Sequence, residues 1–120
     1  MTRTEERSQL RADVGRLVEG LGRDAGEVAS SLQMAGVRGA RHDVGGCPLT
    51  TYLRAVMGAD SRVDDVRVHA GHATVGRRWS KPVKVPLPGA ARDFVVAFDR
   101  GEFPKLVRSY GDAGEPLPRR

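Results

Sequence analysis

The sequence contains one cysteine, Cys47, so no disulfide can form within the chain. Long hydrophobic runs are also lacking. The longest apolar stretch is FVVAF at residues 94–98, far short of the ~18 residues that a membrane-spanning helix needs. The first ten residues, MTRTEERSQL, have no apolar core of the kind found in signal peptides. These absences argue against a disulfide scaffold and a membrane protein, and we expect a cytoplasmic location.

Nucleotide-binding and redox motifs are missing as well. The sequence has neither a Walker-type phosphate loop nor a GxGxxG stretch, and a single cysteine excludes a CxxC pair. The glycine-rich segment 36–47 follows a predicted helix rather than a strand. The paired acids Glu5-Glu6 and Asp64-Asp65 are neighbours in sequence, whereas acid–base catalysis needs carboxylates that face each other across a cleft. We therefore predict a protein that is not an enzyme, with no catalytic residues and no cofactor.

Isoleucine and asparagine are absent, and 17 of the 20 basic residues are arginine. Such a composition is typical of a high-GC genome, so part of the net charge of +5 reflects codon supply. The distribution of charge is more informative. Residues 1–60 carry 8 basic and 8 acidic side chains, residues 61–120 carry 12 and 7, and residues 66–92 carry no acid. This asymmetry predicts a basic surface in the second half of the chain.

The periodicity of apolar residues predicts the secondary structure. Helical spacing and capping residues predict helices at residues 4–21, 24–35, 48–58, 89–100 and 104–110. For the second of these helices, Asp24 followed three residues later by Glu27 fits a capping box. Alternation predicts strands within 66–75 and an edge strand within the proline-containing segment 81–88. This order favours an α+β fold with N-terminal helices, a basic antiparallel hairpin in a three-stranded sheet, and two C-terminal helices packed on that sheet. We expect one domain over residues 1–110 and a flexible C-terminal tail at 111–120.

The hairpin prediction includes a register. The stretch VRVHAGHATV alternates around Ala70-Gly71, which indicates a tight turn at these two residues. A turn there pairs Val66 with Val75, Val68 with Ala73, and His69 with His72. It puts the valines on one face and the polar side chains on the other, as a sheet with one buried face requires.

Cys47 and the histidines can be interpreted either as a reactive or metal-binding site or as ordinary structural residues. A thiol at the start of a predicted helix can have a lowered pKa and react as a nucleophile, but a small residue packed at a helix start explains Cys47 without further chemistry. His69 and His72, together with Cys47 and the His42-Asp43 pair, have side chains that bind zinc, yet they lie on three separate segments. We favour packing for Cys47 and predict no metal site.

The best indication of function is the segment VGRRWSKPVKV at residues 75–85. Its arginines and lysines can neutralise phosphates or acidic side chains, and its tryptophan can stack on a base or anchor a protein interface. A tryptophan that fills the core is the alternative. The predicted contact residues are Arg67, Arg77, Arg78, Trp79, Lys81 and Lys84.

Two functions remain open. The first is a small non-enzymatic accessory or regulatory protein that binds an acidic protein partner through its basic hairpin, with the apolar segment 85–107 also allowing a homodimer. The alternative is nucleic-acid binding, because three helices followed by a basic hairpin is the element order of a winged helix-turn-helix. The connection at 36–47 is too long for a helix-turn-helix turn, and the helix at 48–58 offers few groups for base contacts. We therefore favour a protein partner.

The stretches GGCPLTTYLRA and VPLPGAARDFVVAFDRGEFPKLV together resemble small uncharacterised proteins of high-GC actinobacteria, over roughly residues 25–108. The resemblance implies a bacterial cytoplasmic protein and carries no activity or site residues.

Overall fold

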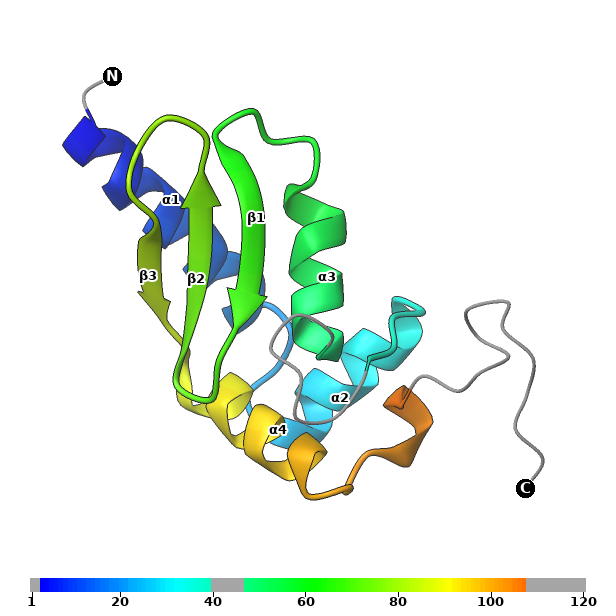
Figure 1. Cartoon of the computed structure of the whole chain (residues 1–120). Coiled ribbons are helices and arrows are strands. Elements are labelled where there is room, and N and C mark those ends of the chain that lie inside the picture. The colour runs from blue at the N-terminus through cyan, green and yellow to red at the C-terminus, as the bar shows by residue number, and fades with distance from the viewer. Residues whose placement is uncertain (1–2, 40–46, 108–120) are drawn as a thin grey trace.

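The computed structural model describes residues 3–39 and 47–107 of the chain. Within these residues it has the predicted α+β fold, with a three-stranded antiparallel sheet and four α-helices, one fewer than predicted (Figure 1). The elements are α1 (Arg3–Glu19), α2 (Ala25–Met34), α3 (Pro48–Met57), β1 (Val63–Val68), β2 (His72–Arg77), β3 (Val83–Pro86), α4 (Gly89–Asp99) and η1 (Pro104–Leu106). The helix predicted at 104–110 is the single 3-10 turn η1 within the described residues, and the predicted tail at 111–120 lies outside them.

The start of α2 shows how local sequence sets a helix end. Asp24 is the N-cap, and its Oδ1 accepts a hydrogen bond from the Glu27 amide at 2.9 Å. The Glu27 carboxylate accepts in turn from the Arg23 amide at 2.7 Å. Two amides that lack a helical partner are satisfied in this reciprocal way, which confirms the cap predicted from the Asp24–Glu27 spacing.

The sheet has the order β1-β2-β3, with the register predicted for the hairpin. Val66 pairs with Val75 and Val68 with Ala73. Beyond the strands the His69 amide donates to the His72 carbonyl at 2.7 Å, which closes the turn at Ala70-Gly71. β3 is an edge strand, because it pairs only with β2 in the described sheet.

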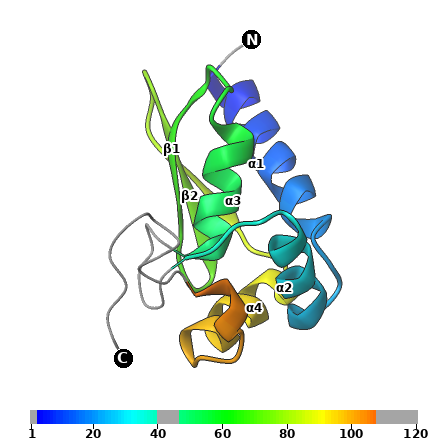
Figure 2. The same ribbon diagram turned by 90° about the vertical axis from the view of Figure 1, so that its right-hand side faces the viewer.

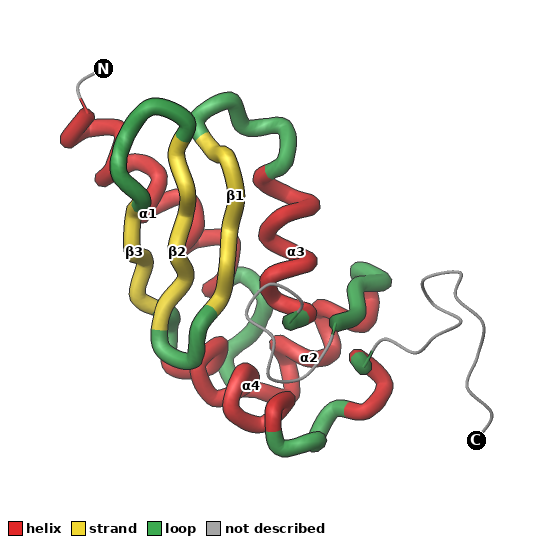
Figure 3. Tube along the Cα trace, in the orientation of Figure 1, coloured by secondary structure: helices red, strands yellow, loops and turns green. Residues whose placement is uncertain are grey.

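The helices that cover the sheet are α1 and α3. α1 packs against β3 and α3 against β1, on the same side of the sheet (Figure 2). The expectation that two C-terminal helices cover the sheet is wrong, because α4 packs mainly on α2 at the end of the sheet (Figure 3). The loop from α3 into β1 is short, so α3 packs back along β1. It therefore covers the part of the sheet that the C-terminal helices were expected to cover.

One continuous core joins the two layers. The buried face of the sheet contributes Val66, Val68, Val75, Val83 and Val85. Under it lie Leu10 and Val14 of α1 together with Leu49 and Leu53 of α3, and around the end of the sheet lie Leu32, Phe94 and Phe98. The Phe94 ring contacts Phe98 and Phe103 at centroid distances of 5.8 and 5.4 Å, which fixes the chain after α4 to the core.

An ion-pair cluster ties the loop before β1 to α1. The Arg62 guanidinium donates to Asp60 at 2.6 Å and to Asp13 at 3.0 Å, and Asp13 also pairs with Arg16. Hydrogen bonding from Arg62 lowers the pKa of both Asp13 and Asp60 below the usual carboxyl value. The loop is therefore held more firmly when both carboxylates are ionised.

Candidate interaction surface

The face of the sheet opposite α1 and α3 is polar and exposed. Its central row is formed by three paired positions, Arg67 of β1, Thr74 of β2 and Lys84 of β3. The Arg67 side chain is 60% exposed, Lys84 is exposed and Thr74 is half-buried. Two of the predicted contact residues, Arg67 and Lys84, therefore lie on one open face.

The loop between β2 and β3 carries a second group of predicted residues. Trp79 is 89% exposed, and Arg78 and Lys81 beside it are exposed as well. Trp79 therefore does not fill the core, which was the alternative interpretation of the only tryptophan. A fully exposed tryptophan leaves a large apolar ring in water, which is typical of a contact residue.

Arg77 differs from the other predicted contact residues, because its side chain points to the buried face and is only 3% exposed. Its guanidinium donates to the Glu6 carboxylate at 2.8 Å and to the Lys81 carbonyl at 2.9 Å. Arg77 therefore joins α1 to the end of β2 and is not placed to contact a partner. Strand alternation carried the signal for this, since Ala73 and Val75 precede it on the buried face.

The free edge of β3 is protected against pairing with another strand. Residues 82, 84 and 86 direct their backbone groups to that edge, and two of them are prolines without an amide N–H. From α1, the Arg7 guanidinium donates to the Pro82 carbonyl at 3.5 Å and Arg11 donates to the Lys84 carbonyl at 3.4 Å. Strand addition at this edge would have to displace both arginines.

The edge of β1 is covered by α3 in a similar way. Buried Thr50 accepts a hydrogen bond from the Val68 amide at 3.1 Å, and the Arg54 Nε donates to the Val66 carbonyl at 3.0 Å. Thr50 and Arg54 are among the few groups that the helix predicted at 48–58 offers for base contacts, but both bond to β1, and these contacts have no signal in the local sequence. With both edges covered, the open part of the sheet is its outer face.

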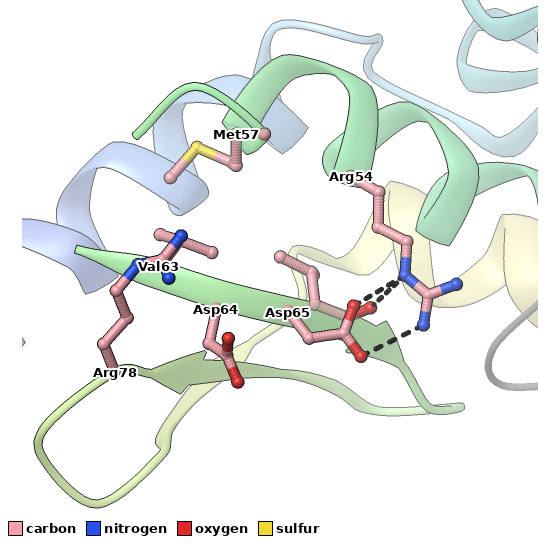
Figure 4. Close-up of a pocket in the computed structure, with 8 residues that line it drawn as sticks. Arg54, Met57, Val63, Asp64, Asp65 and Arg78 are labelled. Carbon is pink, nitrogen blue, oxygen red and sulfur yellow. Dashed lines mark hydrogen bonds and ion pairs between the residues drawn. The ribbon is translucent and has the colours of Figure 1, made fainter. Parts of the chain in front are cut away.

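A small cavity of about 230 Å³ lies between α3 and the start of β1 (Figure 4). Asp65 in its wall accepts hydrogen bonds from Arg54 at 2.8 and 3.2 Å. Partial burial raises the pKa of Asp65, but hydrogen bonds from the Val66 amide and from Arg54 outweigh it, so the pKa lies below its usual value. The Asp64 side chain, by contrast, points away from Arg54 in this view. The two acids are not arranged as a catalytic pair, and Asp65 acts as an ion-pair partner.

The two histidines of the hairpin stack on each other, with ring centroids 4.6 Å apart. Burial, the neighbouring His69 and the charge of Lys84 lower the pKa of His72 below its usual value. Among the residues that the structure describes, no group of three or more His, Cys, Asp or Glu side chains is placed to hold a metal ion. The other histidine of the zinc hypothesis, His42, and Asp43 lie outside the described residues.

Cys47 is the N-cap residue of α3 and is only 4% exposed. Burial raises the pKa of its thiol, in contrast to the lowered pKa that a helix N-terminus favours. The desolvation of a thiolate at this position therefore outweighs the hydrogen bonds from the Thr50 and Leu49 amides, which lower the pKa. Cys47 packs as a small apolar side chain in the core, which is the interpretation favoured from the sequence.

Comparison of the chain with protein-family models, with curated proteins and with solved structures gives no significant match. No helix within residues 3–39 and 47–107 is long and apolar enough to cross a membrane. The functional interpretation that follows rests on the chain's own residues.

Proposed function

We propose that this chain is a small cytoplasmic accessory protein that acts by binding, without catalysis, and that its partner is a protein with an acidic surface. The contact is made by the β2–β3 loop and the outer face of the sheet. The single observation that carries this proposal is the exposure of Trp79 between the exposed cations Arg78 and Lys81.

The chemistry of the loop fits a protein interface. Tryptophan and arginine are both enriched among the residues that dominate binding energy at protein interfaces. Tryptophan buries a large ring with few rotatable bonds, and arginine can donate several hydrogen bonds. The exposed cations of the loop, Arg78 and Lys81, favour an acidic partner, and residues 66–92 themselves contain no carboxylate. Trp79 would be the anchor, and the charges would guide the encounter.

Nucleic-acid binding is less well supported by the geometry. A winged helix-turn-helix protein reads bases with an exposed recognition helix. The corresponding helix here, α3, has its Thr50 buried and its Arg54 bonded to Asp65 and β1. Only the loop cations and Trp79 would be left for a sequence-independent contact with nucleic acid.

The decisive experiment compares two substitutions of equally exposed apolar residues. Trp79 and Met34 are 89% and 88% exposed, and Trp79 lies in the β2–β3 loop whereas Met34 ends α2. Immobilised wild-type chain, Trp79→Ala and Met34→Ala are each incubated with native lysate, and retained proteins are quantified by mass spectrometry. We expect the wild type and Met34→Ala to retain the same acidic proteins, and we expect Trp79→Ala to lose them.

Retention of the same proteins by all three baits would overturn the proposal. A parallel titration of labelled single- and double-stranded DNA, followed by anisotropy at about 50 and 200 mM salt, tests the alternative. Binding that weakens steeply with salt and is lost in Arg78→Glu would make nucleic acid the partner instead.

A further inference from the structure

The outer face of the sheet carries a compact polar group, Arg67, Thr74 and Lys84, with His72 beside it. We propose that this group binds a single phosphoryl group, carried by a phosphorylated side chain of the protein partner. The inference rests on the proposed function, since it names the group of the partner that the sheet recognises.

Strand pairing brings the three side chains together. Arg67 pairs with Thr74, and Thr74 pairs with Lys84, so the two cations flank the threonine on one face. Because neighbouring strands lie about 4.8 Å apart, the Cα atoms of Arg67 and Lys84 are about 10 Å apart. Both side chains are long enough to meet above the threonine hydroxyl. A tetrahedral oxyanion at that point would accept hydrogen bonds from a guanidinium, an ammonium and a hydroxyl group.

The carboxylate nearest to this group in the sheet, Asp65, forms an ion pair with Arg67 but offsets its charge only in part. Asp65 is held by Arg54 at 2.8 and 3.2 Å, whereas Arg67 approaches the same carboxylate only at 3.5 Å. The Arg67 side chain remains 60% exposed. A ligand with two negative charges competes well for such a guanidinium, because bidentate pairs with phosphate are shorter and stronger than this contact.

His72 lies on the same face, two residues before Thr74 on β2. The charged and titratable groups near it are His69, stacked on its ring, and Lys84, whose charge helps to lower its pKa. A bound phosphoryl group would offset the charge of Lys84 and favour the protonated ring. Phosphate binding should therefore raise the pKa of His72.

The extent of the basic group indicates one phosphoryl group rather than a nucleic-acid backbone. The neighbouring row on one side pairs Asp65 with Gly76, and the row on the other side pairs His72 with Pro86. On this face of the sheet, the arginine and lysine side chains therefore lie in one row of paired residues, the row of Arg67, Thr74 and Lys84. A nucleic-acid strand presents a phosphate at every nucleotide and is held by a longer series of cations.

The test is an NMR titration of the full ¹⁵N-labelled chain with the peptide acetyl-Gly-phosphoSer-Gly-amide, with the serine peptide as control. We expect saturable shifts at the amides of Arg67, Thr74 and Lys84 and a raised pKa of His72 with the phosphopeptide only. Lys84→Gln removes one charge-assisted hydrogen bond and should weaken binding about tenfold or more. Lys105→Gln, an exposed lysine on η1, should leave the affinity unchanged.

Equal shifts with the serine peptide, or wild-type affinity in Lys84→Gln, would overturn the inference. The inference would also be overturned if a short single-stranded oligodeoxythymidine shifted the same amides and the phosphopeptide did not. Amide spectra of the variants establish that each remains folded. Partner capture by Trp79→Ala tests the proposed function separately, because the phosphopeptide titration monitors the amides of the sheet and not the β2–β3 loop.

Discussion

Arg77 and Arg78 are adjacent in the chain, and the structure predicts opposite results when each is replaced by glutamine. Arg77 is buried and bonded to Glu6 and to the Lys81 carbonyl, whereas Arg78 is exposed. We expect Arg77→Gln to destabilise the fold and Arg78→Gln to weaken partner binding with the fold intact. The pair is a matched control, because the chemical change is the same in both variants.

The size of the destabilisation in Arg77→Gln follows from the contacts that the Arg77 side chain loses. Breaking a fully buried ion pair costs about 3–5 kcal/mol, but the Glu6 side chain is 32% exposed, so water takes over part of its solvation. Adding the lost bond to the Lys81 carbonyl, we expect Arg77→Gln to lower the free energy of unfolding by about 2–3 kcal/mol. For a chain of this length that corresponds to a Tm lowered by roughly 10 °C. Arg78→Gln should stay within about 0.5 kcal/mol of the wild type.

Urea unfolding followed by far-UV circular dichroism measures both values. Tryptophan fluorescence is a poor choice here, since Trp79 is already 89% exposed in the folded chain. A double-mutant cycle with Glu6→Gln should give a coupling energy of at least about 1 kcal/mol for the Arg77 pair. Equal stabilities of Arg77→Gln and Arg78→Gln would refute the assignment of Arg77 to the buried face.

Three further predictions concern the core and the loop before β1. Thr50→Val removes the acceptor of a buried amide at the edge of β1 and should cost about 1–3 kcal/mol in urea unfolding, with Thr50→Ser milder. Because the pKa values of Asp13 and Asp60 are lowered in the fold, their stabilisation is complete above the unfolded carboxyl pKa of about 3.9 and is lost as the pH falls through the folded values. Urea unfolding over this acid range should show a weaker pH dependence in Arg62→Gln, and an unchanged dependence would contradict the ion-pair assignment. The Cys47 thiol should react slowly with a thiol reagent in the folded chain and rapidly in denaturant, and fast reaction in the folded chain would show that it is accessible.

The parts of the fold that were predictable from the sequence depend on local patterns. The turn at Ala70-Gly71 fixes the hairpin register, because a shift by one residue would expose the valines. The Asp24–Glu27 spacing fixes the start of α2, since both cap bonds span only a few residues. The prolines at 82 and 86 mark β3 as an edge strand, because a central strand needs the amides they lack.

The candidate surface was predictable only in part. The sequence identified the basic segment and its tryptophan, but a tryptophan among basic residues is compatible with either a core or a surface position. Likewise, composition did not separate Arg77 from its neighbours. Strand alternation favours the buried face for Arg77, but its partner Glu6 lies 71 residues away, and local spacing does not predict such a contact.

The sequence by itself therefore determined the element order, the hairpin register and the presence of a basic segment, because these follow from periodicity, turn residues and charge counts over short distances. The tertiary structure alone decided which part of that segment is open. α1 covers the edge of β3 through Arg7 and Arg11, and α3 covers the edge of β1 through Thr50 and Arg54. These contacts join residues far apart in the chain, and they leave the outer face of the sheet and the loop with Trp79 as the accessible surface.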